Sequence, residues 1–321
     1  MRLTPAQLRT RAAEARAHYA SCDLCAHRCL VDRTSGPAGR CHEGDSVFLA
    51  GAGVHFGEEQ PLVGSRGGRR ARSGSGLVLI GGCNLACRSC ETADLSLERK
   101  GLTEVDAAQL GALFLDLQAK GAANLNLVTP THVLPALLEG LAAAAEGAFD
   151  LPVVWNCGGY ESLEALRLLE DVVDVYLPDA KYGDDAVAEL LSGCRGYTAA
   201  LRESLLEMHR QVGVLQKPGE DGLSTRGVLV RHLVLPNGAA GSGSVLRLCA
   251  EVSPELWVNV MSQYRPLHLA RAPLPDKPGL PVLASPPRID RRPTGAEVTA
   301  ALQAARDAGL RNLLLDGAPV R

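Results

Sequence analysis

Short apolar runs alternate with helix-like segments along most of the chain. The apolar runs predict buried strands at 77–80, 125–128, 152–155, 172–177, 228–234, 257–261 and 312–315. The spacing of apolar residues between them predicts helices over 103–120, 131–146, 162–170, 184–191, 199–212, 243–252 and 296–308. Thr103 is the expected N-cap of the first of these helices. Thr294 and Glu297 form a capping box before the last one.

Strands that alternate with helices indicate βαβ units and a parallel sheet, so the fold class is α/β. About six such units predict an open or partial (β/α)6-type barrel over residues 77–321. Two segments precede it. Residues 1–63 are expected to form a helix and a small cysteine-rich, metal-binding extension, and residues 64–76 form a basic Gly/Arg/Ser linker.

The composition of the chain argues against some classes of function. The chain has 321 residues, a net charge of -3 and 46% hydrophobic residues, values that give no signal for nucleic-acid binding. No apolar run reaches the roughly 18 residues of a membrane helix, and the charged N-terminus does not resemble a signal peptide. We therefore expect a cytoplasmic protein. In a reducing compartment its ten cysteines indicate metal or redox chemistry rather than disulfides.

The segment GGCNLACRSC follows the first predicted strand and spaces Cys83, Cys87 and Cys90 as C-x3-C-x2-C. Three thiolates this close in sequence can hold three corners of a 4Fe-4S cluster. The fourth iron then stays open, as is usual for a reactive metal rather than a structural one. A zinc knuckle or a ferredoxin site would have a different spacing. The segment therefore predicts a catalytic iron–sulfur site.

A second group of cysteines lies near the N-terminus. Cys22, Cys25, Cys29 and Cys41 are spaced as C-x2-C-x3-C-x11-C, with a turn at Gly36-Pro37. Four thiols within twenty residues suit a closed four-thiolate site. Either zinc or an auxiliary iron–sulfur cluster fits, because the spacing does not separate them.

Polar side chains gather where successive predicted strands end. In a parallel sheet these ends meet at one edge, so the side chains are expected to line a pocket near the cluster. Taken singly, Thr129 or Asn156 could cap a helix, and Lys181 could be a solvated lysine. The candidate residues for cofactor binding are Thr129, Thr131, Asn156, Asp179, Lys181, Arg231 and His232.

The linker carries four arginines, Arg66, Arg69, Arg70 and Arg72. They are either a docking surface for an acidic one-electron donor, such as flavodoxin or ferredoxin, or a solvated loop.

From about Cys22 onwards the sequence resembles radical S-adenosylmethionine proteins of the pyruvate formate-lyase activating enzyme-like family, relatives of the glycyl-radical activases. The stretches that carry the resemblance include CDLCAHRCLVDR, PLVGSRG, GGCNLACRSC, NLNLVTPTHVLP, VVDVYLPDAKY, GVLVRHLVLPNG and VMSQYRP. The resemblance implies a 4Fe-4S cluster on Cys83, Cys87 and Cys90, with S-adenosyl-L-methionine on the open iron.

Several of the candidate residues gain a role from this resemblance. Asp179 and Lys181 match an aspartate-x-lysine pair that contacts S-adenosylmethionine, and Arg231 and His232 occupy a strand position whose counterparts face the cofactor. Thr129-Pro130-Thr131 replaces the glycine-glycine-glutamate of many relatives, as is typical of this subfamily. Ser89 stands where most relatives have an aromatic residue.

The resemblance implies an oxidoreductase-type enzyme that receives an electron from an external donor and forms a 5′-deoxyadenosyl radical. Two kinds of substrate are then open. One is a partner enzyme, activated by hydrogen abstraction from a glycine, and the other is a small molecule, peptide or RNA. A hypothesis of another class is an iron–sulfur electron carrier or a metal-stabilised binding protein without catalytic activity.

Overall fold

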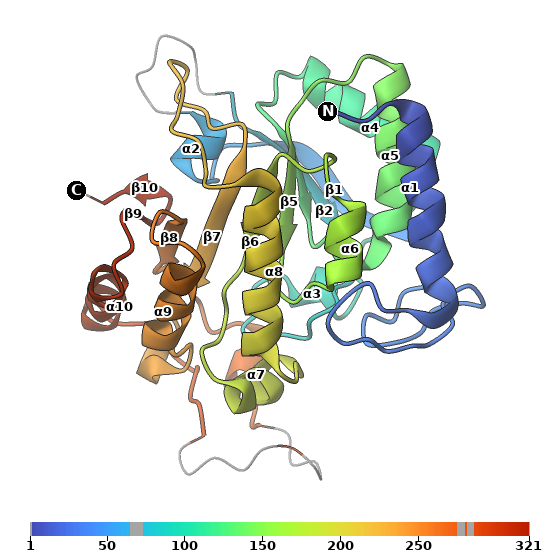
Figure 1. Ribbon diagram of the computed structural model, residues 1–321. Coiled ribbons are helices and arrows are strands. Elements are labelled where there is room, and N and C mark those ends of the chain that lie inside the picture. The colour runs from blue at the N-terminus through green and yellow to red at the C-terminus, as the bar shows by residue number, and fades with distance from the viewer. Residues whose placement is uncertain (1, 65–72, 275–279, 281–285, 321) are drawn as a thin grey trace.

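The computed structural model describes residues 2–64, 73–274, 280 and 286–320. It has an α/β fold built on one mostly parallel sheet (Figure 1), which confirms the predicted class. Across the sheet the described strands follow the order β10-β9-β8-β7-β6-β5-β4-β2-β1-β3. Their bounds are β1 Val47–His55, β2 Ser75–Ile80, β3 Thr103–Val105, β4 Leu125–Val128, β5 Val153–Cys157, β6 Val175–Pro178, β7 Gly227–Leu233, β8 Trp257–Met261, β9 Asn312–Leu315 and β10 Ala318–Pro319.

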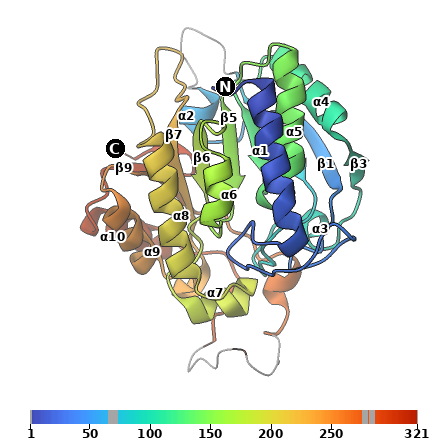
Figure 2. The same ribbon diagram turned by 45° about the vertical axis from the view of Figure 1, so that its right-hand side comes forward.

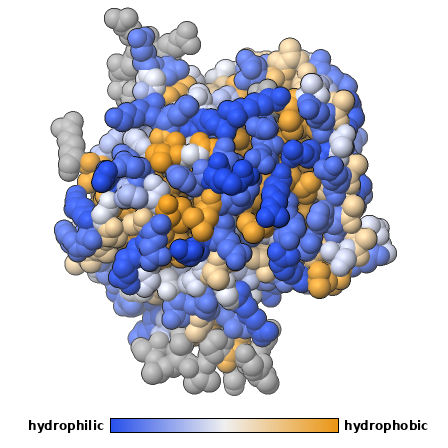
Figure 3. Space-filling model, viewed as in Figure 1, coloured by the Kyte–Doolittle hydropathy of each residue, from blue (hydrophilic) through white to orange (hydrophobic). Residues whose placement is uncertain are grey.

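Helices cover one face of this sheet, as the two views in Figures 1 and 2 show. On the solvent side of these helices, apolar areas are interrupted by hydrophilic residues (Figure 3). None of the described helices is both long enough and apolar enough to cross a membrane. The helices are α1 Pro5–Ala17, α2 Gln60–Val63, α3 Ala93–Ser96, α4 Ala107–Ala119, α5 Leu134–Glu146, α6 Leu163–Leu168, α7 Asp185–Ser192, α8 Tyr197–Val212, α9 Ser242–Val252 and α10 Gly295–Asp307.

Parallel pairing joins β2, β4, β5, β6, β7, β8 and β9, each to the next. Their carboxyl ends therefore lie at the same edge of the sheet, where open α/β folds bind ligands. The central strands β5 and β6 are buried on both faces, and the indole of Trp155 on β5 is fully enclosed. The predicted capping box of Thr294 and Glu297 is confirmed at the start of α10.

The helix predicted over 103–120 is partly wrong. Thr103–Val105 forms β3, which pairs antiparallel with β1, and the helix begins only at Ala107. Its N-cap is Asp106, whose carboxylate accepts a hydrogen bond from the backbone N–H of Gln109. Pairing with β1 thus outweighs the helical pattern of the first turn, and a carboxylate is a strong alternative cap.

The segment expected to precede the sheet contributes a strand to it. β1 pairs antiparallel with β2 from Leu49 to His55, beside the cysteine loop that follows β2. The structure describes only residues 64 and 73–76 of the basic linker, and Ser75 and Gly76 already belong to β2. The linker arginines Arg66, Arg69, Arg70 and Arg72 lie outside the described residues.

A buried ion pair ties the segment after β1 to the far side of the sheet. Arg231 on β7 donates to both carboxylate oxygens of Glu59 at 2.7 Å. Its Nη2 also contacts Glu58 at 2.5 Å. Asn259 on β8 donates to Glu59 at 2.8 Å. Burial alone would raise the pKa of Glu59, but Arg231 and Asn259 lower it below its usual range.

We expect Glu59→Gln to lower the free energy of unfolding by roughly 2–3 kcal/mol at pH 7, since the buried Arg231 charge then loses one of its two carboxylate partners and keeps only Glu58. The pKa of Glu59 is lower in the folded protein than in the unfolded chain. The pair therefore stabilises the protein above about pH 5, and the stabilisation is lost as the pH falls. Urea unfolding at pH 7 and pH 4 measures both effects. Glu146→Gln breaks an exposed pair with Arg9 and serves as the control, with an expected loss below about 1 kcal/mol. Equal losses in the two variants would contradict this account.

Candidate functional site

The loop 81–90 leaves the carboxyl end of β2 and carries three cysteines. Two of its backbone N–H groups donate to the end of α7, from Ala86 to Ser192 at 3.5 Å and from Arg88 to Leu191 at 2.7 Å. The last carbonyls of a helix have no partner within the helix, so the loop satisfies them. The loop also needs Gly82, which has φ +76° and whose Cβ would collide with the Glu43 carboxylate. The backbone of the loop is therefore fixed independently of its thiols.

The three cysteines of this loop line one pocket with the polar ends of β4, β5 and β6. The pocket has a volume of about 830 Å³, part of it open to solvent. No three His, Cys, Asp or Glu side chains in the described part of the chain lie close enough together to share a single metal ion. The thiolates of a 4Fe-4S cluster bind different irons, so a cluster site does not need the three thiols to meet at a single ion. The predicted residues on its wall are Cys83, Cys87, Cys90, Thr129, Asn156, Asp179 and Lys181.

Asp179 and Lys181 follow β6 and form an ion pair, with 2.6 Å between Nζ and Oδ2. Burial would lower the pKa of Lys181, but the Asp179 carboxylate holds it well above its usual range. Lys181 is therefore charged at any physiological pH. Burial raises the pKa of Cys87, and this ammonium opposes the rise.

One tyrosine that the sequence analysis missed positions this pair. The hydroxyl of Tyr197 accepts the backbone N–H of Lys181 at 2.8 Å and donates to the carbonyl of Asp179 at 2.9 Å. Its ring stacks on Tyr160, with 5.8 Å between centroids. No sequence motif marks Tyr197, because the contact depends on how α8 packs against the end of β6.

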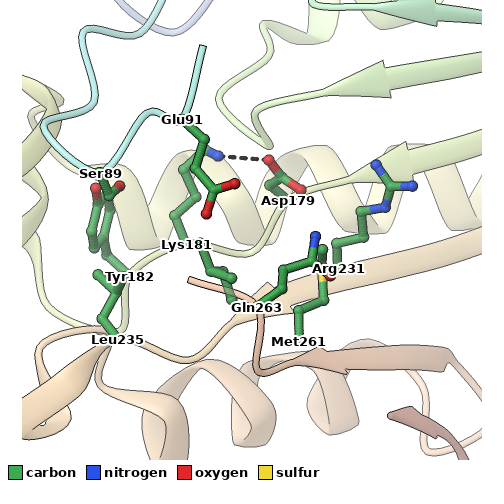
Figure 4. A pocket seen from close by; sticks show the side chains of 10 residues that line it. Ser89, Glu91, Asp179, Lys181, Tyr182, Arg231, Leu235, Met261 and Gln263 are labelled. Atoms are coloured by element: carbon green, nitrogen blue, oxygen red, sulfur yellow. Dashed lines mark hydrogen bonds and ion pairs between the residues drawn. The ribbon is translucent and has the colours of Figure 1, made fainter. Parts of the chain in front are cut away.

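A second pocket of about 630 Å³ adjoins the first and shares Asp179 and Lys181 with it (Figure 4). Arg231 lines this second pocket, together with Glu91, Met261 and Gln263. Its guanidinium is already paired with Glu58 and Glu59, so the charge of Arg231 is largely neutralised before any ligand binds.

Thr129 and Asn156 line the cysteine pocket. Thr129 has φ +58°, a conformation that is strained for a β-branched residue. Its backbone N–H donates to the carbonyl of Asn156 at 2.9 Å. The Asn156 amide donates to Asn126 at 3.3 Å. A strained residue at a pocket wall is typical of functional sites, where the surroundings enforce the geometry.

Two of the predicted cofactor-binding residues, Thr131 and His232, do not line either of these pockets. His232 follows Arg231 on β7 and points to the opposite face, because side chains alternate along a strand. Its ring contacts the carbonyl of Ala180 at 2.7 Å and the hydroxyl of Ser242 at 2.9 Å. Thr131 is buried in a short turn and donates to Glu161.

Glu161 is a buried carboxyl group beside the site. It is only 4% exposed, and its Oε1 has no hydrogen-bond partner. Burial raises its pKa to about 7, although the hydrogen bond from Thr131 opposes the rise. Cys157, at the end of β5, lies on the wall of the cysteine pocket. Glu161 therefore lies one side chain away from that pocket.

We expect Glu161→Gln to become more favourable relative to wild type as the pH rises. The pKa of Glu161 is higher in the folded protein than in the unfolded chain, so wild type loses stability between about pH 4.5 and pH 7. The difference in unfolding free energy between variant and wild type should shift by about 2–3 kcal/mol between pH 5 and pH 8. Urea unfolding at both pH values tests this, with the exposed Glu104→Gln as control. A difference that does not change with pH would refute the assignment.

The N-terminal cysteines line a separate cavity. Cys22, Cys25, Cys29 and Cys41 all contribute to its wall. Asn84 belongs to the same wall, while its neighbour Cys83 faces the first pocket. One stretch of the loop thus separates the two groups of cysteines.

Comparisons with known proteins add a distant relative. No protein-family profile matches this chain. A protein of Methanocaldococcus jannaschii, itself described as uncharacterised, is 29% identical over 295 residues, which cover 89% of this chain and 75% of the relative. Its description gives no activity, so any functional conclusion depends on the residues of the site.

Proposed function

We propose that this protein is a radical S-adenosylmethionine enzyme whose sheet forms a partial barrel of the type found in that superfamily. The observation that carries the proposal is the shared pocket of Cys83, Cys87 and Cys90 with Asp179 and Lys181. A cluster of four irons held by these three thiolates would supply the electron that cleaves the sulfonium of S-adenosylmethionine, giving methionine and a 5′-deoxyadenosyl radical.

The protein groups around this pocket have complementary tasks. S-adenosylmethionine carries a carboxylate and ribose hydroxyls. The Lys181 ammonium suits the carboxylate, and the Asp179 carboxylate suits the hydroxyls. Tyr197 holds the backbone of both residues, so their positions are set before the ligand binds. The adjoining pocket, beyond Asp179 and Lys181, is the place for the substrate hydrogen that the radical removes.

The proposed reaction needs an electron donor and a substrate that gives up a hydrogen atom. An external one-electron donor, such as flavodoxin or ferredoxin, must reduce the site once per turnover. The substrate is either a glycine of a partner enzyme or a small molecule, peptide or RNA. An oxidoreductase of this kind acting in the cytoplasm fits the cysteine usage of the chain.

A second candidate function rests on Cys157, a fourth thiol on the wall of the same pocket. If Cys157 were the fourth ligand, the site would be a closed cluster suited to electron transfer. Cys157, however, is only 4% exposed, whereas Cys83, Cys87 and Cys90 are half-buried. Three partly exposed thiols and one buried thiol favour the open site.

The test is anaerobic reconstitution with iron and sulfide, reduction with dithionite, addition of S-adenosylmethionine and chromatography for 5′-deoxyadenosine. We expect product from wild type and from Cys157→Ala, and none from Cys87→Ala, because only the latter removes a cluster ligand. Cys249→Ala changes a buried cysteine on α9, away from both pockets, and serves as the matched control. A wild-type cluster that binds no S-adenosylmethionine, together with a Cys157→Ala variant that loses its cluster, would favour the electron carrier.

A further variant tests the role of the acid. Asp179→Asn keeps the shape of the side chain but removes its charge, so we expect affinity for S-adenosylmethionine to fall about tenfold, the effect of roughly 1.4 kcal/mol in binding free energy. Iron content and the visible spectrum of the reconstituted protein should not change. Equilibrium dialysis with radiolabelled S-adenosylmethionine measures the affinity. Unchanged affinity would show that Asp179 does not contact the ligand.

A further inference from the structure

Arg33 is a buried cation beside the N-terminal cysteines. It is 1% exposed, and its guanidinium lies over the ring of Tyr19, 4.1 Å from the centroid. It donates to the carbonyls of Glu43 and Gly44, each at 2.9 Å, and of His132 at 2.7 Å. Its remaining hydrogen bond goes to Cys22 Sγ at 3.5 Å. All four acceptors are uncharged in the thiol form of the protein.

Among the described residues, no carboxylate is hydrogen-bonded to this guanidinium. The Glu43 carboxylate acts on it only from a distance, because it is paired with Arg99. The described wall of the cavity contains four cysteines and two arginines, Arg33 and Arg40, but no aspartate or glutamate. An arginine is always charged, and burying an uncompensated charge is costly. The cavity therefore lacks an anion.

We propose that Cys22, Cys25, Cys29 and Cys41 bind a metal centre as four thiolates and that Arg33 is its buried counter-charge. In the described residues these four thiols do not converge on one ion, so zinc would have to draw them together, whereas the thiolates of a 4Fe-4S cluster bind different irons. In either case four thiolates leave two excess negative charges, around Zn²⁺ or around a 4Fe-4S core of charge 2+. A zinc site and a 4Fe-4S site would therefore present the same feature to Arg33, a compact anion with sulfur acceptors. When the centre forms, the four thiol protons pass to solvent and the metal takes their place.

The site adjoins the cysteine loop of the proposed active site without depending on it. The ring of His132 contacts the carbonyl of Gly81 at 2.9 Å, while its own carbonyl accepts from Arg33. Asn84 lies in the cavity wall between Cys83 and Leu85. A metal centre in this cavity would stabilise the cysteine loop on the side opposite the first pocket, whatever reaction the loop supports.

The experiment uses the full chain with Cys83, Cys87 and Cys90 all changed to Ala, so that metal bound at the N-terminal cysteines is measured alone. One arm adds Zn²⁺ against a chromophoric chelator, and the other adds iron and sulfide anaerobically and measures iron content. Arg33→Gln, which removes the charge, should weaken metal binding about 10- to 100-fold, as loss of an outer partner of a metal site does. Arg33→Lys, which keeps the charge, should retain most of the affinity.

Arg28→Gln is the matched control, because Arg28 lies between Cys25 and Cys29 but is exposed and paired with Glu164. We expect it to change metal affinity less than twofold. Thermal unfolding with and without metal separates charge balance from a purely structural role. A structural Arg33 would lower stability equally in both states, whereas a counter-charge lowers it more in the metal-bound state.

Each outcome decides the proposal. Binding in either arm, weakened by Arg33→Gln and not by Arg28→Gln, supports it and identifies the metal. No binding in either arm overturns it, as does equal affinity of the Arg33→Gln variant and its parent. Should Arg33→Gln fail to fold, Arg33→Lys and alkylation of the unmutated N-terminal thiols remain. Metal must then protect four cysteines in the parent protein, and absence of that protection overturns the proposal. Because the catalytic thiols are absent throughout, failure here leaves the proposed radical chemistry untouched.

Discussion

The parallel pairing of seven successive strands is the constraint on which the whole site depends. Backbone hydrogen bonds fix the register of β2 against β4 and of β5 against β6, so the residue after each strand has a set place at the same edge. The cysteine loop, Thr129, Asn156 and the pair of Asp179 and Lys181 all stand at that edge. These four parts of the site are far apart in sequence. The chemistry of the pocket is thus a product of main-chain geometry, to which the side chains are added.

Two further sets of contacts stabilise this edge of the sheet. Behind the cysteine loop, the carbonyls at the end of α7 accept its backbone N–H groups, and Tyr197 at the start of α8 holds the end of β6. Within the sheet, Glu58 and Glu59 hold Arg231 from a segment that precedes the loop. The same segment follows β1, which is paired with β2. Residues before the cysteine loop therefore support it from both the edge and the interior of the sheet.

Features set by local sequence could be predicted. The strand before the loop, the capping box of Thr294 and the two spacings of cysteines are visible in single stretches of sequence. β1 was missed because Gly51 and Gly53 interrupt its pattern, and glycine is unfavourable in strands. The helix predicted from Thr103 began too early because its first turn pairs with that unseen strand.

Side chains whose roles depend on distant partners could not be predicted. Arg231 and His232 are adjacent in sequence, and only the register of β7 tells which of them faces the pocket. Arg33 has no local signal, because one of its acceptors is the carbonyl of His132, 99 residues away. Glu161 looks like an ordinary surface glutamate until the packing around β5 encloses it.

The large sequence separation between Glu59 and its partners has a consequence for biosynthesis. Its partners Arg231 and Asn259 lie 172 and 200 residues further along the chain, and the N–H of Gln60 bonds to the carbonyl of Gly317. A ribosome must synthesise the chain as far as Gly317 before all of these contacts can form. Such non-local contacts slow folding. The cavity of the N-terminal cysteines likewise needs Asn84 and His132 for its wall. These thiols therefore leave the ribosome before their enclosure is complete, and in that period they are open to metal delivery and to oxidation.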